Sequence, residues 1–166
     1  MSEHCAVRVN TTHLFVAGGT ASDSTIHAAA FLHDWAADTW TRLPDMAEPR
    51  AEHACGLASD PERIVVVGGV SEENVQLERT LIFDLAAMAW RQGPEIPARG
   101  FLTYSQSLPY GDSFVLVGGY GYESRQALGA IWRFKPETEQ FVTLRERLAR
   151  PRAGHAVVAL PVDMEC

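Results

Sequence analysis

Histidine and cysteine are the residue types that most often bind metals or act as nucleophiles, and the chain has six histidines and three cysteines. His13, His27 and His33 show no ligand spacing with one another, and no cysteine pair accompanies them. The sequence contains no GxSxG or HExxH motif and no cysteine–histidine constellation. We therefore expect no metal, no cofactor and no catalytic residue, and we predict that the chain is not an enzyme.

Other side chains are better suited to binding a partner than to catalysis. Tyr120, Tyr122 and Arg125 fall within the short stretch YGYESRQ, and tyrosine and arginine dominate binding hot spots. Glu72 and Glu73 lie in the corresponding stretch VSEENVQ. We treat all five as candidate partner-binding residues. The alternative is that they are ordinary solvated loop residues.

The elements that would position these loops repeat along the chain. An apolar run ends in two glycines three times, at a spacing of 50 residues. The pairs are Gly18–Gly19, Gly68–Gly69 and Gly118–Gly119. A fixed period of this length indicates a repeat architecture.

Each glycine pair is followed by further markers of the same period. About twenty residues later comes an aromatic residue, and later still an arginine that in two repeats precedes a histidine by three positions. The aromatic residues are Trp40, Trp90 and Phe141, the arginines are Arg50, Arg99 and Arg152, and the histidines are His53 and His155, with His4 at the same position one repeat earlier. Recurrence favours a structural role for these residues, although Arg99 also stays a candidate for partner binding.

One repeat, residues 53–102, predicts four short strands separated by turns, and no long helix is expected anywhere, including the alanine-rich stretch 26–37. RIVVVGG is apolar on both faces, so this strand must be covered on both sides. The glycines close it either because another backbone comes near or because they need positive φ, and both explanations stay open. A phosphate loop is excluded, since none of the pairs has the lysine and helix that it requires.

The repeating pattern resembles the kelch repeat over almost the whole chain, because a glycine pair, an aromatic residue, an arginine and a histidine recur with this period. Two departures are Phe141 in place of tryptophan and Leu102 where the middle repeat lacks its histidine. The resemblance implies an all-β protein, a β-propeller in which each repeat is one four-stranded blade. It also implies that Trp40 and Trp90 pack between blades, so that truncating either to alanine costs roughly 3–5 kcal/mol.

The resemblance divides the chain 1–166 into a partial propeller of three blades, with boundaries at 4–52, 53–102 and 103–154, and a spare closing strand at 155–160. Three blades cannot close a ring of the usual four to eight. We therefore expect the C-terminal half of a six-bladed propeller, completed by the remainder of that propeller. A dimer of two half-propeller chains is the alternative.

The composition of the chain limits which cellular compartment and which classes of partner are expected. The formal net charge of −7 disfavours nucleic acid, and no apolar run is long enough to span a membrane. The opening MSEHCAVRVN has no signal-peptide pattern, and the three cysteines do not suggest a disulfide scaffold, so we expect a cytoplasmic protein. Cys5 and Cys55 share one register of the repeat and are predicted to be inert and buried.

The kelch resemblance favours a non-catalytic protein–protein interaction module. Such a module can be the substrate-recognition part of a ubiquitin ligase adaptor or part of an actin-associated protein, and the sequence does not say whether BTB and BACK domains precede it. The alternative is a kelch-propeller enzyme (an oxidase, an epimerase or lyase-like) whose catalytic residues lie in the missing half. Fold alone does not fix function, so the partner's identity is left open.

Overall fold

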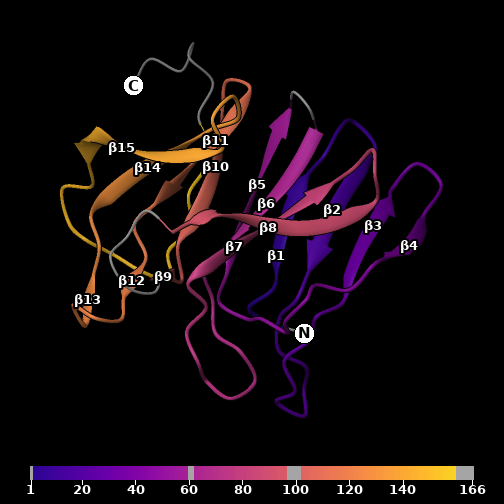
Figure 1. Ribbon diagram of the computed structural model, residues 1–166, viewed down its shortest axis with the longest axis horizontal. Coiled ribbons are helices and arrows are strands. Elements are labelled where there is room, and N and C mark those ends of the chain that lie inside the picture. Colours follow the sequence, from indigo (N-terminus) through magenta and orange to yellow (C-terminus); the bar gives the residue numbers. More distant parts are fainter. Residues whose placement is uncertain (1, 60–61, 97–101, 160–166) are drawn as a thin grey trace.

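The computed structural model describes residues 2–59, 62–96 and 102–159, and it is built from antiparallel sheets (Figure 1). The first sheet contains β1 (Cys5–Arg8), β2 (His13–Ala17), β3 (Ala30–Asp34) and β4 (Thr39–Leu43). The second contains β5 (Ala54–Ser59), β6 (Glu62–Val67), β7 (Arg79–Asp84) and β8 (Ala89–Glu95). The third contains β10 (Gln106–Tyr110), β11 (Ser113–Val117), β14 (Ala130–Lys135) and β15 (Gln140–Arg147). A small three-stranded sheet joins β9 (Leu102–Thr103), β12 (Tyr120–Gly121) and β13 (Gln126–Ala127).

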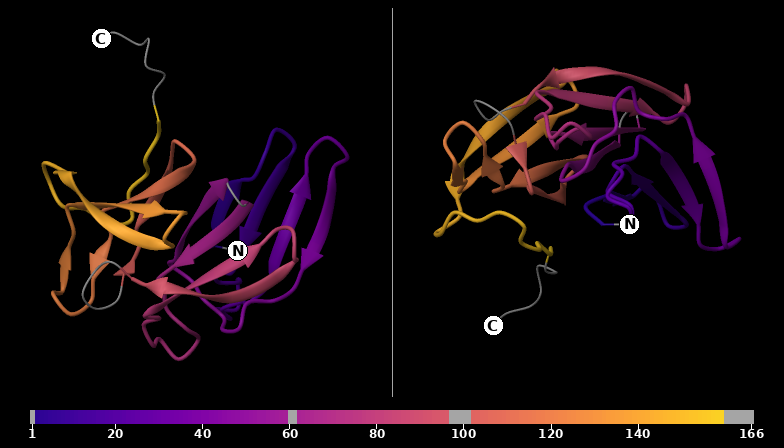
Figure 2. Two further views of the ribbon diagram at one scale, coloured as in Figure 1. Left: turned by 45° about the horizontal axis from the view of Figure 1, so that its top comes forward. Right: turned by 90° about the horizontal axis from the view of Figure 1, so that it is seen from below.

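The prediction of an all-β protein is confirmed. The described residues contain no helix, and Ala30–Asp34 of the alanine-rich stretch forms β3. Within each large sheet the strands follow one another in chain order, as expected for propeller blades. The three blades stand next to one another along an open arc (Figure 2).

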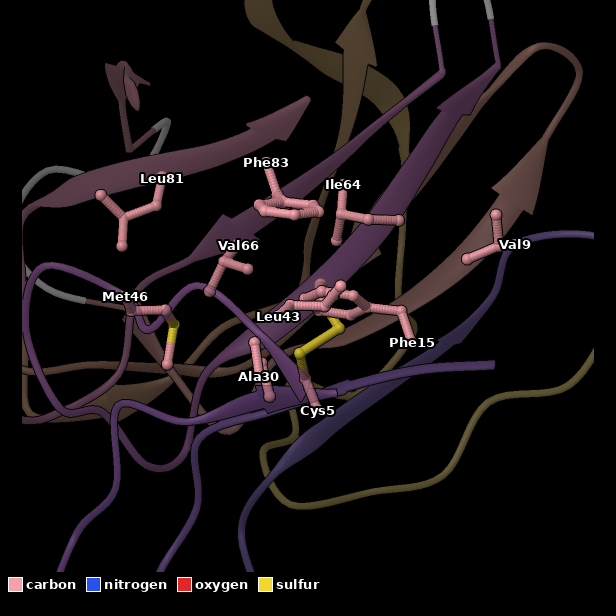
Figure 3. Close-up of a cluster of buried hydrophobic side chains, with 12 residues drawn as sticks. Cys5, Val9, Phe15, Ala30, Leu43, Met46, Ile64, Val66, Leu81 and Phe83 are labelled. Atoms are coloured by element: carbon pink, nitrogen blue, oxygen red, sulfur yellow. A yellow bond between two sulfur atoms is a disulfide. The ribbon is translucent and has the colours of Figure 1, made fainter. Parts of the chain in front are cut away.

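The second strand of the middle blade, β6, is buried on both faces because a neighbouring blade covers each side. In β6, Ile64 and Val66 enter a cluster shared with the first blade, whereas Val65 and Val67 enter a cluster shared with the third. The first cluster also holds Phe15 from β2 (Figure 3). The strand has apolar side chains on both faces because a blade packs against each of them.

The paired glycines serve both purposes that the sequence left open. All six have positive φ, between 59° and 112°. A Cβ on Gly118 would come within 2.6 Å of the carbonyl oxygen of Arg152, and Gly18 faces the Arg50 carbonyl in the same way. The backbone that joins one blade to the next passes directly over the first glycine of each pair, so neither the conformation nor the space admits a side chain.

Trp90 packs between blades, whereas Trp40 makes no contact with another blade among the described residues. The Trp90 indole contacts Phe15 of the first blade, and its Nε1 donates a hydrogen bond of 2.7 Å to the Pro44 carbonyl. Trp40 is 57% exposed and stacks only on His33 and the edge of Phe31. The reason is positional: the tryptophan packs on the preceding blade, and Trp40 lies in the first blade of the chain.

Trp90→Ala should lower the free energy of unfolding by roughly 3–5 kcal/mol, because it removes a large inter-blade side chain and its hydrogen bond. Trp40→Ala should cost about 1 kcal/mol or less, as expected at an exposed site. Urea unfolding of the two variants checks this. Equal losses at the two positions would contradict the packing order described above.

The two cysteines of the repeat are buried, but the prediction that they are inert is wrong. Cys5 of β1 and Cys55 of β5 form a disulfide bond, with a Cα–Cα distance of 5.7 Å. Both occupy the same register of the innermost strands of neighbouring blades, which brings the two side chains together. The low cysteine count did not predict this bond. A single disulfide needs only two cysteines at the same register of neighbouring blades.

Reducing this bond should lower the stability of the folded chain. The bridge closes a loop of 50 residues, for which chain entropy predicts a contribution of about 4 kcal/mol. We expect a lower urea midpoint in dithiothreitol than without it, and no such difference for Cys5→Ala or Cys55→Ala. An unchanged midpoint, with the bond verified by peptide mass mapping, would show that it contributes nothing.

The predicted closing strand is not formed within this chain. Residues 155–159 belong to no strand, and position 160 lies outside the described residues. Val158 is 76% exposed there. A partner strand from the remainder of a propeller or from a second half-propeller chain stays a prediction.

Candidate binding surface

The loops that follow the glycine pairs gather at one end of the blades, together with the segments that link one blade to the next. Figure 1 shows the loops after β2 and β6, and β12 and β13, on the same lower side as the N-terminus. Bridges between Ser2 and Thr20 and between Ala51 and Val70 tie each linking segment to its loop. We call this end, residues 2–4, 20–29, 48–53, 70–78, 102–104 and 120–129, the loop mouth.

A ladder of backbone hydrogen bonds runs along the loop mouth from blade to blade. The Glu52 N–H donates to the Glu3 carbonyl at 3.0 Å, Tyr104 to Glu52 at 2.9 Å, and Gly154 to Tyr104 at 3.1 Å. All four residues have φ between 51° and 61°, a conformation that non-glycine residues rarely adopt. The repeat thus places one side chain per blade in the same orientation at this end.

The ladder brings Glu3, Glu52 and Tyr104 into one cluster. The Tyr104 hydroxyl donates to Glu52 Oε1 at 2.6 Å, and the Thr20 hydroxyl donates to Glu3 Oε2 at 2.8 Å. Burial, with the nearby Glu3 charge adding to it, raises the pKa of Glu52. Burial and the Glu52 carboxylate raise the pKa of Tyr104. The donors to Glu3 and Glu52 at this end are thus neutral hydroxyl groups, which do not cancel the charge of the carboxylates.

These residues were missed as candidates, although a signal existed. A glutamate directly precedes both His4 and His53, in SEH and AEH, so Glu3 and Glu52 share a register of the repeat. In the structure Tyr104 takes that position in the third repeat. Ser105, not Leu102, takes the place of the histidine, beside Gly119 as His53 lies beside Gly69.

The predicted tyrosines lie beside this cluster. Tyr120 pairs with Thr103 in the small sheet, and Tyr122 meets it edge to face, with ring centroids 5.9 Å apart. Tyr122 is exposed, and Arg125 is exposed with φ of 49° and its N–H directed at the Tyr122 carbonyl. The structure thus brings Tyr120 and Tyr122 together on one loop, with Arg125 at its tip.

The remaining candidates are more scattered. Glu72 and Glu73 are exposed on the loop after β6, at the same mouth, and no ion pair involves them within the described ranges. Arg99 lies outside the described residues. Whether any of them binds a partner stays a prediction.

Arg50 and His53 lie at the junction between the first two blades. Arg50 is 1% exposed, and its Nη1 donates to the Gly68 carbonyl at 3.2 Å. Burial lowers its pKa to about 10. The His53 Nε2 lies 3.1 Å from the Ala17 carbonyl oxygen, and burial lowers the pKa of His53 to about 3, with the charge of Arg50 as a second cause. Both residues therefore connect two blades in the interior.

The equivalent pair after the third blade has a different environment. Arg152 is exposed, and its Nε bonds only to the Arg150 carbonyl, whereas Arg50 reaches the following blade. Neither ring nitrogen of His155 has a hydrogen-bond partner within the described part of the chain. The recurring arginine thus becomes an interior residue only where a further blade follows it.

His53 should make stability fall with acidification. The pKa of His53 is about 3 in the folded chain and 6.5 ordinarily. Between pH 3 and pH 6.5, therefore, the imidazole is protonated in the unfolded chain and neutral in the folded one. Stability contributed by neutral His53 is complete above pH 6.5 and decreases below it by about 1.4 kcal/mol per pH unit. Urea midpoints at pH 7 and pH 5 should converge in His53→Gln but not in the control His27→Gln. The same pH slope in all three proteins would contradict the burial of a neutral imidazole.

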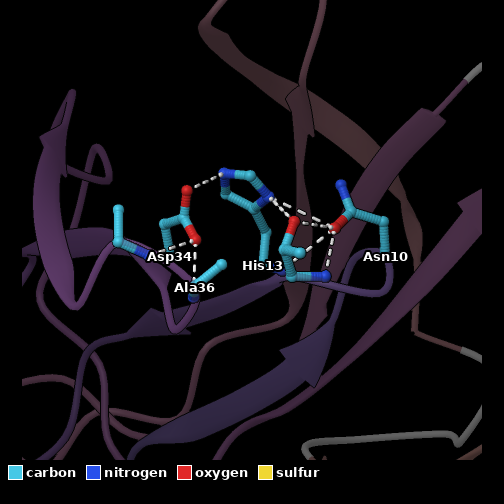
Figure 4. A network of polar contacts seen from close by, with 6 residues as sticks. Asn10, His13, Asp34 and Ala36 are labelled. Carbon is cyan, nitrogen blue, oxygen red and sulfur yellow. Dashed lines mark hydrogen bonds and ion pairs between the residues drawn. The ribbon is translucent and has the colours of Figure 1, made fainter.

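At the opposite end of the blades, several carboxylates have partners within the fold. Asp34 lies 3.7 Å from His13 Nε2 and accepts the N–H groups of Ala36 and Ala37, and His13 in turn contacts Asn10 (Figure 4). Glu139 pairs with Arg63 and Arg91, which joins the second and third blades. A pocket of about 280 Å³ lies over the inner strands β1, β5 and β10, and its lining includes Arg8, Leu57 and Leu108.

Two general features of the described residues bear on the type of site. They include no group of three or more histidine, cysteine, aspartate or glutamate side chains that could hold a metal ion. Among them there is also no helix with the length and apolarity to cross a membrane.

Comparison with known proteins identifies relatives with the same repeat. "Kelch-like protein terF" of Aspergillus terreus is 24% identical over 163 residues, which are 92% of this chain and 35% of that protein. An F-box/kelch-repeat protein of Arabidopsis thaliana is 37% identical over 86 residues, 50% of this chain and 23% of that one. Kelch-like protein 7 of Rattus norvegicus is 29% identical over 111 residues, 67% and 18% of the two chains. The chain thus spans between 18% and 35% of the length of these relatives.

Structural comparison gives the same fold. The structure of YjhT, a kelch β-propeller, matches with a TM-score of 0.69 at 15% identity, covering 91% of this chain and 53% of YjhT. A model of the KLHDC2/KLHL20/DRC7 kelch-repeats domain matches residues 3–164. With three blades, three positive-φ glycine pairs and this match over nearly its whole length, the chain belongs to the kelch-repeat family.

Proposed function

We propose that the chain is a non-catalytic protein–protein interaction module that binds its partner at the loop mouth. Membership of the kelch-repeat family is the observation that carries this proposal. The relatives described as Kelch-like and F-box/kelch-repeat proteins favour a more specific role, the substrate-recognition part of a ubiquitin ligase adaptor. A partner that is recognised in this way would be a protein.

The geometry of the loop after β11 supports the location. Its counterparts in the first two blades, TASDST and VSEENVQ, are small or acidic, whereas this loop presents Tyr122 and Arg125 to solvent beside Tyr120. Rigid aromatic side chains give a large contact area for little lost conformational entropy. The loop is also anchored, because Tyr120 pairs with Thr103 and with Ala127 on its two sides.

Tyr122→Ala and Arg125→Ala should each weaken partner binding by about 30-fold, equivalent to roughly 2 kcal/mol for a hot-spot residue. The measurement is calorimetry with a partner identified by affinity purification on the immobilised chain. Tyr110→Ala is the matched control, because Tyr110 is also exposed (50%, against 37% for Tyr122) but lies at the end of β10 at the opposite mouth.

Two results would reject this location. One is unchanged affinity of the Tyr122 and Arg125 variants with unchanged stability. The other is loss of binding in Arg50→Ala without unfolding, which would make the interior arginine the functional one. Equal loss in the Tyr110 control would show that binding is spread over the whole surface.

A further inference from the structure

We propose that the loop mouth of the first two blades binds a lysine- or arginine-bearing segment of a partner protein, with Glu52 and Tyr104 as its anchor. This inference rests on the proposed function, since it names the chemistry of the partner that the interaction module would accept.

The anchor is built into the backbone of the blades. The hydrogen-bonded ladder fixes Glu3, Glu52 and Tyr104 in the left-handed conformation at three successive blades. Tyr104 donates to only one oxygen of the Glu52 carboxylate, at 2.6 Å. A carboxylate has about four acceptor positions, so this one has capacity for further donors. A guanidinium or an ammonium group supplies such donors in the form of a cation.

Negative charge is unbalanced at this mouth. Its acidic residues in the first two blades are Glu3, Asp23, Glu48, Glu52, Glu72, Glu73 and Glu78. The one basic side chain of the same described segments, Arg50, is buried in the blade junction. At the opposite mouth, by contrast, Asp34 and Asp84 accept backbone N–H groups and Glu139 pairs with two arginines. Within the loop mouth, Asp23 likewise accepts a backbone N–H and Glu48 lies 3.9 Å from Arg50, whereas Glu72, Glu73 and Glu78 are exposed to solvent.

A buried hydroxyl provides an independent indication of a ligand. Thr103 is 1% exposed, and its Oγ1 has no hydrogen-bond partner among the described residues. Its hydrogen is directed at the Glu52 carboxylate and lowers the pKa of Glu52 less than burial raises it, so it is the Thr103 oxygen that lacks a donor. Unsatisfied buried hydroxyls are rare and call for an explanation. A bound donor beside Glu52 would give the Thr103 oxygen a partner.

The aromatic ring of Tyr104 completes the anchor. It is 37% exposed at the edge of the cluster, and its hydroxyl is already held by Glu52. A ring face next to a carboxylate is the combination that attracts Arg and Lys side chains, through cation–π contact and charge. Burial without a cation keeps the pKa of Glu52 raised, and an arriving cation would lower it.

The occupant is a protein segment because the charge excludes the other polymers. Nucleic acid and anionic membrane surfaces carry negative phosphates, which an acidic mouth repels. The Tyr120–Tyr122 pair adjoins the anchor through the pairing of Tyr120 with Thr103. One extended segment can therefore place a basic side chain at Glu52 and an apolar one at the tyrosines.

The test is an NMR titration of the 166-residue chain with a Gly-Ser peptide that carries a single arginine, compared with the same peptide carrying glutamate. The arginine peptide should shift the amide signals of Glu52, Thr103 and Tyr104, and the glutamate peptide should not. Glu52→Gln should weaken the arginine peptide about tenfold, the value of one charged hydrogen bond. Tyr104→Phe should weaken it less, because the ring is retained.

The control is Glu62→Gln, which removes the same charge at the opposite mouth. Equal weakening by Glu52→Gln and Glu62→Gln would overturn the proposal, as only net charge would then matter. Shifts at Glu52 caused by calcium chloride but not by the peptide would also overturn it. If the arginine peptide causes no shifts while Tyr122→Ala still weakens binding of a purified partner, this inference is wrong and the proposed function stands. If the peptide causes no shifts and Tyr122→Ala leaves partner binding unchanged, both the inference and the proposed binding site are rejected.

Discussion

The close passage of each linking segment over a glycine pair is the constraint on which the rest of the structure depends. The Arg50 and Arg152 carbonyls lie where a Cβ on Gly18 or Gly118 would be, and the N–H groups of Gly19 and Gly119 bond to those same carbonyls. This contact fixes how far apart two blades stand. The distance in turn sets the width of the apolar layer between them, which Phe15 fills in the first junction.

The same contact determines what the loop mouth displays. A linking segment held against a glycine pair continues into Glu52 or Tyr104, and each donates its N–H to the preceding segment. A side chain at this register therefore cannot move independently of the blade stack. Sites built on such a fixed backbone lose little entropy on binding, which makes this register better suited to an anchor than the tip of a free loop.

Much of the fold could be predicted because it depends on local patterns. Two-sided apolar strands, glycine pairs and the fixed period are properties of single repeats, and β6 and β11 formed as expected. Trp40 and the Cys5–Cys55 bond could not be assigned in this way, because each depends on which blade lies beside another. The same holds for the segment 155–159, which reads as a strand but has no neighbour in the chain to pair with.

The candidate site was predictable only in part, for a related reason. Tyr122 and Arg125 were recognisable from composition, since their residue types stand out in a short loop. Glu52 did not stand out, because its importance comes from three residues in different repeats meeting through backbone hydrogen bonds. Its acidic neighbours look like ordinary solvated side chains in sequence. At the opposite mouth Glu139 meets Arg63 and Arg91, whereas Glu52 accepts a hydrogen bond from the neutral Tyr104 hydroxyl, and this difference supports the proposal that Glu52 binds a partner.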